Sequence, residues 1–259
     1  MSAPLPALFI GHGSPLNALR ENEWTRAWAA LGAALPRPRA LLAISAHWYT
    51  TGTAVTAMAA PRTIHDFGGF PRELYEVRYP ARGDAALARR VAQVLAPLSV
   101  AADESWGLDH GSWSVLLHMY PRADLPVVQL SIDAREPAQF HYDIGTRLRA
   151  LRTEGVLVLG SGNVVHNLRL YARGEPAQEP YPWALRFENY IREHLTAGEH
   201  ATLIDYDALG EDAQLSVPTP EHYLPLLYIM GAAAPGEPVS IPVHGIDAGS
   251  ISMLAVQFG

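Results

Sequence analysis

Apolar residues occur along this chain in short runs whose lengths match buried β-strands. Leu5 to Ile10 is such a run, and it ends at Gly11-His12-Gly13. A run of four to eight apolar residues bounded by turn residues is typical of a strand that is covered on both faces. The strands predicted in this way span residues 5–10, 40–46, 54–58, 127–132, 156–159 and 250–258.

Between these runs, apolar residues recur at the three- and four-residue spacing of amphipathic helices. The positions from Leu87 to Leu95 show this spacing, and they follow Asp84, whose side chain suits a helix N-cap. Thr219-Pro220 is a second start signal, with Thr as the N-cap and Pro at the first helical position. Besides the helix behind Asp84, the predicted helices span residues 18–33, 112–120, 137–152, 182–196 and 219–231.

The alternation of strands and helices predicts the fold class. It indicates an α/β protein with a mostly parallel central sheet between two layers of helices, a three-layer α/β/α arrangement, in which the last strands are free to pair antiparallel. We expect residues 1–259 to form a single catalytic domain, a length that α/β folds reach as one unit. Ligands of such sheets bind at the carboxyl ends of the strands.

Composition and charge exclude several classes of partner and site. With 49% hydrophobic and 17% charged residues, the chain can bury a substantial core. The net charge of −7 and the absence of a Lys/Arg cluster argue against nucleic acid or an anionic membrane as a partner. The chain has no cysteine, which excludes disulfides and thiolate metal sites.

Targeting signals are also lacking in the sequence. Residues 1–6 show no signal-peptide pattern, and no apolar run reaches the roughly 18 residues that a membrane span requires. We therefore expect a cytoplasmic location without a membrane partner.

Four histidines occupy special positions in this pattern. His12 and His47 each come just after a predicted strand, and His166 follows the strand that ends at Gly160-Ser-Gly-Asn. His222 lies at the start of the helix behind Thr219. A single histidine at a strand end is most often a structural residue, but strand ends that converge on one edge of a sheet indicate a common site. The Gly160 segment matches neither a P-loop nor a full GxSxG, so we interpret it as a tight turn that presents His166.

Six segments, in order and without a large gap, resemble the motifs of the DODA-type extradiol dioxygenases, the DOPA 4,5-dioxygenase branch of the LigB family. They are residues 9–19 (FIGHGSPLNAL), 44–48 (ISAHW), 64–71 (IHDFGGFP), 108–113 (LDHGSW), 156–168 (VLVLGSGNVVHNL) and 218–226 (PTPEHYLPL). The resemblance implies an enzyme that opens the aromatic ring of a catechol with O2 at a non-haem Fe(II) site. The same ligand set also suits Zn(II).

The resemblance also implies a role for each matching residue. His12, His47 and His222 match the metal ligands, and His166 matches the acid–base histidine, which in zinc-loaded members also reaches the metal. His110 matches a second-sphere histidine that is a further catalytic and substrate-contacting candidate. His65 matches a substrate-side wall, and the aromatic candidates for that wall include Trp48 and Tyr223.

Two alternatives remain open from the sequence. The related protocatechuate-cleaving branch binds iron through two His and one Glu, and Glu221 is adjacent to His222. Neighbouring helical residues point about 100° apart, so only one of the two can face the metal well. The same histidines would also serve a zinc hydrolase, and the same scaffold would serve a non-catalytic metal-binding protein.

Overall fold

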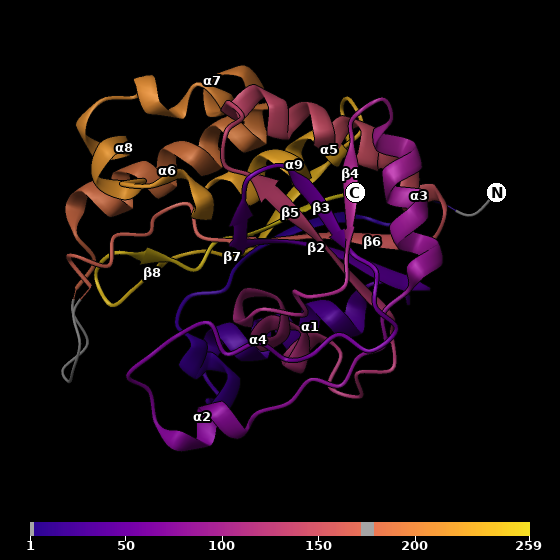
Figure 1. Ribbon diagram of the computed structural model, residues 1–259. Helices are drawn as coiled ribbons and strands as arrows, with labels where there is room; N and C mark the ends of the chain where they lie inside the picture. The colour runs from indigo at the N-terminus through magenta and orange to yellow at the C-terminus, as the bar shows by residue number, and fades with distance from the viewer. Residues whose placement is uncertain (1–2, 172–178) are drawn as a thin grey trace.

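The computed structural model describes residues 3–171 and 179–259, and within them a sheet of eight strands forms the centre of the molecule (Figure 1). The strand order is β4-β3-β5-β2-β6-β1-β10-β7. These strands are β1 (Ala7–Gly11), β2 (Ala40–Thr50), β3 (Thr53–Thr56), β4 (Val100–Asp103), β5 (Val127–Asp133), β6 (Val156–Gly162), β7 (Val239–Val243) and β10 (Ala255–Phe258). A separate small ribbon pairs β8 (Ile246–Asp247) with β9 (Ile251–Ser252).

The middle of the sheet is parallel and its margins contain antiparallel pairs. Strands β5, β2, β6 and β1 run parallel, as do β3 and β4. β10 is antiparallel to both β1 and β7, and β3 is antiparallel to β5. This confirms the predicted mostly parallel sheet and the antiparallel pairing of the last strands.

Helices cover both faces of the sheet, which gives three layers (Figure 1). One buried cluster joins the sheet to α3, α5, α6 and α9, and a second joins the opposite face to α1 and α4. The helices are α1 (Glu23–Ala34), α2 (Arg72–Glu76), α3 (Ala85–Leu95), α4 (His110–Met119), α5 (Ala138–Thr153), α6 (Pro182–Ala197), α7 (His200–Ile204), α8 (Glu211–Ser216) and α9 (Leu224–Ala232). Short 3-10 turns span η1 (Pro15–Leu19), η2 (Tyr206–Ala208) and η3 (Pro220–His222).

Several predicted boundaries are wrong, each for a local reason. The helix predicted from residue 18 begins at Glu23, because Asn22 and Thr25 form a reciprocal capping box there. The strand predicted to end at Ala46 continues to Thr50, so that His47 lies inside β2.

In the C-terminal part of the chain, one predicted helix and one predicted strand are each split into two elements. The helix expected behind Thr219 is split into η3 and α9, and the Thr219 hydroxyl donates to Glu221 Oε1 instead of capping the backbone. The strand expected over residues 250–258 is split into β9 and β10. Asp84 does cap α3, by accepting from the backbone N–H groups of Ala86 and Leu87. No helix in the described ranges is both long and apolar enough to cross a membrane.

Candidate metal centre

Three adjacent parallel strands bring His12, Ser161 and His47 to one edge of the sheet. β6 lies between β1 and β2, and Ile10 and Ser45 are both in register with Ser161. His12 comes directly after β1, where its backbone N–H donates to Gly162 O at 3.1 Å. The carboxyl ends of these strands therefore supply the first side chains of the site, as expected for a parallel sheet.

An irregularity in β2 directs His47 toward this edge. The pairing of β2 with β5 shifts register between Ile44 and Tyr49, and His47 lies within the shifted segment. Such bulges bend a strand locally and redirect a side chain, and they are common beside active sites. Because the hydrophobic pattern breaks at the bulge, the sequence placed His47 after the strand.

His222 reaches the same place from the connection before α9. The backbone N–H of Asn163 donates to His222 O at 2.8 Å, which docks η3 against the end of β6. This close approach requires a glycine, because a Cβ atom on Gly162 would lie 2.2 Å from His222 O.

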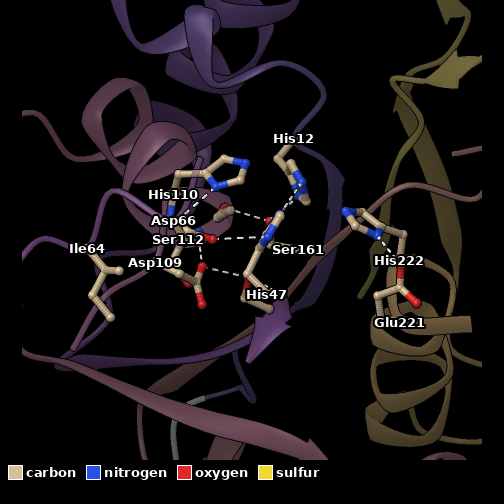
Figure 2. A network of polar contacts seen from close by, with 12 residues as sticks. His12, His47, Ile64, Asp66, Asp109, His110, Ser112, Ser161, Glu221 and His222 are labelled. Atoms are coloured by element: carbon tan, nitrogen blue, oxygen red, sulfur yellow. Dashed lines mark hydrogen bonds and ion pairs between the residues drawn. The ribbon is translucent and has the colours of Figure 1, made fainter. Parts of the chain in front are cut away.

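The three histidines present ring nitrogens to a common point (Figure 2). The Nε2 atoms of His12 and His47 lie 3.1 Å apart. One ring nitrogen from each of His12, His47 and His222 lies within 4.8 Å of the other two. His222 Nε2 is buried, and in the described part of the chain it has no hydrogen-bond partner. Buried polar atoms are normally satisfied, so these converging nitrogens indicate a site for a cation.

Ser161 fixes the tautomer of His12. Its hydroxyl donates to Gly111 O at 2.6 Å, so its oxygen is left to accept from His12 Nδ1, 3.0 Å away. A neutral imidazole carries one proton, which places the lone pair of His12 on Nε2, the atom that faces His47. This pattern, with one ring nitrogen hydrogen-bonded and the other free, is usual for metal-binding histidines.

Carboxylates contact the other two histidines on the same side of the ring. Asp66 Oδ2 lies 3.1 Å from His47 Nδ1, and Asp66 Oδ1 lies 3.1 Å from His110 Nδ1. Glu221 Oε1 lies 3.2 Å from His222 Nδ1. Glu221 thus contacts the far side of the His222 ring, and His222 rather than Glu221 joins His12 and His47 in the converging set.

The electrostatics favour neutral imidazoles at two of these positions. Burial, together with the nearby histidines, lowers the pKa of both His12 and His222 well below the usual range. Burial also opposes ionisation of Asp66, but its contacts with His110 and His47 outweigh this and lower its pKa. For His47, burial is outweighed by Asp66, so its pKa is raised. A cation between the facing Nε2 atoms, either a proton or a metal ion, satisfies the lone pairs, and the donor set fits a metal that accepts imidazole.

His166 lies beside the three histidines but is oriented differently. Its ring stacks on that of His222, with centroids 3.5 Å apart and planes 9° apart. Its backbone N–H donates to Ser216 O, which anchors the turn after β6. Burial and the neighbouring His47 lower its pKa to about 4, so the ring is neutral at physiological pH.

An aromatic wall adjoins His110, the first residue of α4. Phe67 meets His110 edge to face, with centroids 5.5 Å apart, and also contacts Phe70 and Tyr75. His65 packs on Phe67 at 5.7 Å and lies 3.1 Å from Val77 O through its Nε2 atom. The segment between β3 and α3 therefore places His65 against Phe67, which in turn contacts His110.

The structure does not bring Trp48 or Tyr223 to the histidines. Trp48 stacks on Trp106 with centroids 5.6 Å apart, and the described residues show no ring contact between Trp48 and a histidine. Tyr223 is fully buried against Tyr206, and its hydroxyl donates to Leu203 O at 2.8 Å. Both side chains pack in the protein interior in this structure.

Two contributors escaped the sequence reasoning. Asp66 lies inside a recognised segment, but nothing in its spacing links it to His47 or His110. Ser161 lies in the segment that was interpreted as a tight turn, and nothing in the sequence links it to His12. The contact between Ser161 and His12 depends on the register of β6 against β1, which the sequence does not reveal.

Comparisons with known proteins show the family to which the chain belongs. Residues 8–256 match the family model described as the catalytic LigB subunit of aromatic ring-opening dioxygenase. The chain is 55% identical over 262 residues to 4,5-DOPA dioxygenase extradiol of Escherichia coli (strain K12), covering 100% of this chain and 96% of that protein. It is 36% identical over 259 residues to the Beta vulgaris protein of the same name, covering 96% of this chain and 95% of that one.

A solved structure is similar over nearly the whole chain. The crystal structure of an uncharacterised protein from Escherichia coli K12 matches with a TM-score of 0.86 and 50% sequence identity, covering 98% of this chain and 100% of that one. Together with the family match, these similarities show that the chain belongs to the LigB family of aromatic ring-opening dioxygenases and is an enzyme of this kind.

Proposed function

We propose that the chain is a single-domain extradiol dioxygenase that opens the ring of a catechol with O2 at a non-haem Fe(II) site held by His12, His47 and His222. The observation that carries this proposal is the convergence of three ring nitrogens, within 4.8 Å of one another, in a family of ring-opening dioxygenases. Three neutral imidazoles suit Fe(II), and they suit Zn(II) equally well.

When bound, the metal lowers the pKa of a coordinated phenol and provides the template on which catechol and O2 meet. His12, His47 and His222 would hold that metal. The chain's own residues then have to orient the ring and move protons.

We assign proton transfer to His166, with His110 as its partner. The catechol must lose its second phenolic proton, and a neutral imidazole can accept it. His166 is supported in this role by its position, because its ring stacks on that of His222 beside the converging nitrogens. Burial lowers its pKa, which keeps the ring unprotonated at neutral pH. His166 is outside the set formed by His12, His47 and His222, although it forms a separate set of potential ligands with Glu221 and His222. We propose an acid–base role for it at the His12–His47 centre rather than that of a fourth ligand.

We propose that the aromatic wall selects a planar substrate. Phe67, Phe70 and Tyr75 form contiguous edge and face contacts next to His110. Such surfaces pack well against an aromatic ring and exclude water from it. Because the relatives are named 4,5-DOPA dioxygenase extradiol, DOPA is the first catechol to test.

The experiment is oxygen uptake after anaerobic reconstitution with Fe(II). A panel of DOPA, caffeate and unsubstituted catechol is added, and a Zn(II)-loaded sample is the control. Oxygen consumption that is matched by a yellow ring-opened product, and that requires iron, is the expected result. Full iron loading without oxygen uptake from any of these catechols would contradict the proposal and would favour a zinc hydrolase or a metal-binding protein.

A further inference from the structure

Asp66 contacts two histidines of the centre with one carboxylate. Its Oδ1 atom accepts the backbone N–H of His110 at 3.0 Å and lies 3.1 Å from His110 Nδ1. Its Oδ2 atom lies 3.1 Å from His47 Nδ1. The side chain of Asp66 is only 16% exposed, and that of His110 only 6%, so water competes little for these contacts. Figure 2 shows Asp66 beside both rings.

The backbone bond makes this arrangement rigid. Asp66 has no helix or strand of its own to hold it, whereas His110 is the first residue of α4. Asp109, the residue before it, caps that helix by accepting from Ser112 N, and Gln129 donates to the other oxygen of Asp109. Asp66 is thus tied to a fixed helix end, and its second oxygen is held toward β2.

An ionised carboxylate can only accept hydrogen bonds, so it favours a proton on each Nδ1 atom that lies 3.1 Å from it. In the described residues Asp66 Oδ2 and His110 Nδ1 have no other hydrogen-bond partner, so nothing competes with this pairing. A neutral imidazole has one proton, which leaves the lone pair on Nε2 in both rings. For His47 this is the nitrogen 3.1 Å from His12 Nε2. For His110 it is the nitrogen on the far side of the ring from the carboxylate (Figure 2).

We propose that Asp66 is a positioning residue that fixes the Nδ1-protonated tautomer of His47 and His110 together. A single carboxylate thereby prepares one metal ligand and one hydrogen-bond acceptor for a substrate hydroxyl. This inference rests on the proposed function, because it takes His47 as a ligand and His110 as a substrate contact.

The substitution Asp66→Asn tests the inference, because an amide has nearly the same shape but different hydrogen bonding. Its oxygen can still accept from one ring, whereas its nitrogen can only donate. The ring that faces the nitrogen must therefore expose a lone pair at Nδ1 and move its proton to Nε2. Because the backbone N–H of His110 donates to the Oδ1 position, the amide oxygen occupies that position and the amide nitrogen faces His47. The His47 nitrogen that binds metal is then blocked.

Two measurements are made on the full chain. The first is Zn(II) affinity by competition with a chelator, in which we expect Asp66→Asn to weaken binding by about 10- to 100-fold, the usual effect of losing a carboxylate behind a ligand histidine. Asp84→Asn is the matched control, because Asp84 caps α3 away from the site and Asn is also a good cap. Equal affinity of Asp66→Asn and wild type would overturn the inference.

The second measurement needs no folded variant of Asp66. Side-chain 15N NMR of the zinc-loaded wild type reports which nitrogen of each histidine carries the proton, and His110→Gln assigns the signal of His110. Protonated Nδ1 on both His47 and His110 is expected, and a protonated Nε2 on His110 would overturn the inference. Wild-type protein that binds no zinc at all would instead contradict the proposed function, so the two failures are distinguishable.

Discussion

His12 Nε2 lies 3.1 Å from His47 Nε2, and the Nδ1 atom of each ring contacts a different side chain. Ser161 engages Nδ1 of His12, and Asp66 lies against Nδ1 of His47. Two lone pairs that face each other at this distance repel unless a cation lies between them. This pair is the centre of the proposed metal site.

Replacing the third ligand should abolish metal loading. We expect His222→Ala to lose Fe(II) and Zn(II) almost completely, because two imidazoles with no further ligand bind weakly. His166→Ala should retain metal and lose turnover by about 10²- to 10⁴-fold, the range of general acid–base catalysis. Metal analysis and initial rates on both variants provide the comparison. Normal metal content in His222→Ala would instead assign the ligand role to Glu221.

Ser161→Ala should weaken metal binding without a large change in the ligand geometry. The change leaves His12 Nδ1 and Gly111 O without their partner, and we expect about 10- to 100-fold lower Zn(II) affinity. Ser105→Ala, in which an exposed loop hydroxyl is lost, is the control. If both variants bind zinc equally well, Ser161 does not orient His12.

Gly162→Ala should displace His222. The added Cβ would lie 2.2 Å from His222 O, which is backbone and cannot rotate away, so η3 has to move. We expect a loss of about 1–3 kcal/mol of stability, as for other overpacked sites, together with weaker metal binding. Gly68→Ala is the control, because nothing lies within 4 Å of its Cβ position. Denaturant unfolding measures the stability, and chelator competition measures the metal affinity. Unchanged stability and affinity in Gly162→Ala would show that Gly162 and His222 O are not in close contact.

Phe67→Leu should impair substrate binding more than metal binding. Phe67 contacts His110, Phe70 and Tyr75 but is not adjacent to the converging Nε2 atoms. Loss of one aromatic contact is worth about 0.5–1.5 kcal/mol, so KM for a catechol should rise roughly 2- to 10-fold. Phe140→Leu, beside His141 on α5, is the control. A lowered metal content with unchanged KM would remove Phe67 from the substrate wall.

His141 should make the apoprotein less stable in acid. Burial lowers its pKa to about 4, against about 6.5 in the unfolded chain. Between pH 6.5 and 4, His141 is protonated in the unfolded chain but remains neutral in the folded protein. The free energy of unfolding therefore decreases as the pH falls from 6.5 to 4. The shift corresponds to about 3 kcal/mol. Urea unfolding of His141→Gln at several pH values should show a smaller loss over this window, whereas an unchanged slope would contradict the assignment.

The hydrophobic pattern predicted the central strands because their signal is local. β1, β5 and β6 are continuous buried runs, so their length and polarity identify them. β4 and β7 were missed because they lie at the two margins of the sheet, where half of the side chains are exposed and the apolar signal is weak. His47 was placed after its strand because a bulge, which depends on pairing with β5, interrupts the pattern.

The residues of the site also differ in how far the sequence predicts them. Histidines at strand ends could be recognised from the chain alone, since parallel strands deliver their carboxyl ends to one edge. Asp66 could not, because its role depends on where a loop without regular structure meets the first turn of α4. The relation of Glu221 to His222 likewise depends on the orientation of η3, which places Glu221 Oε1 3.2 Å from Nδ1 of the His222 ring.

The most direct test of the metal centre is a crystal structure of the iron- or zinc-loaded protein, with anomalous diffraction used to locate the ion. We predict one ion bound by the Nε2 atoms of His12, His47 and His222, with Asp66, Ser161 and Glu221 outside the coordination sphere. An ion coordinated by Glu221, or one bound between His166 and Glu221 without His12, would contradict this account.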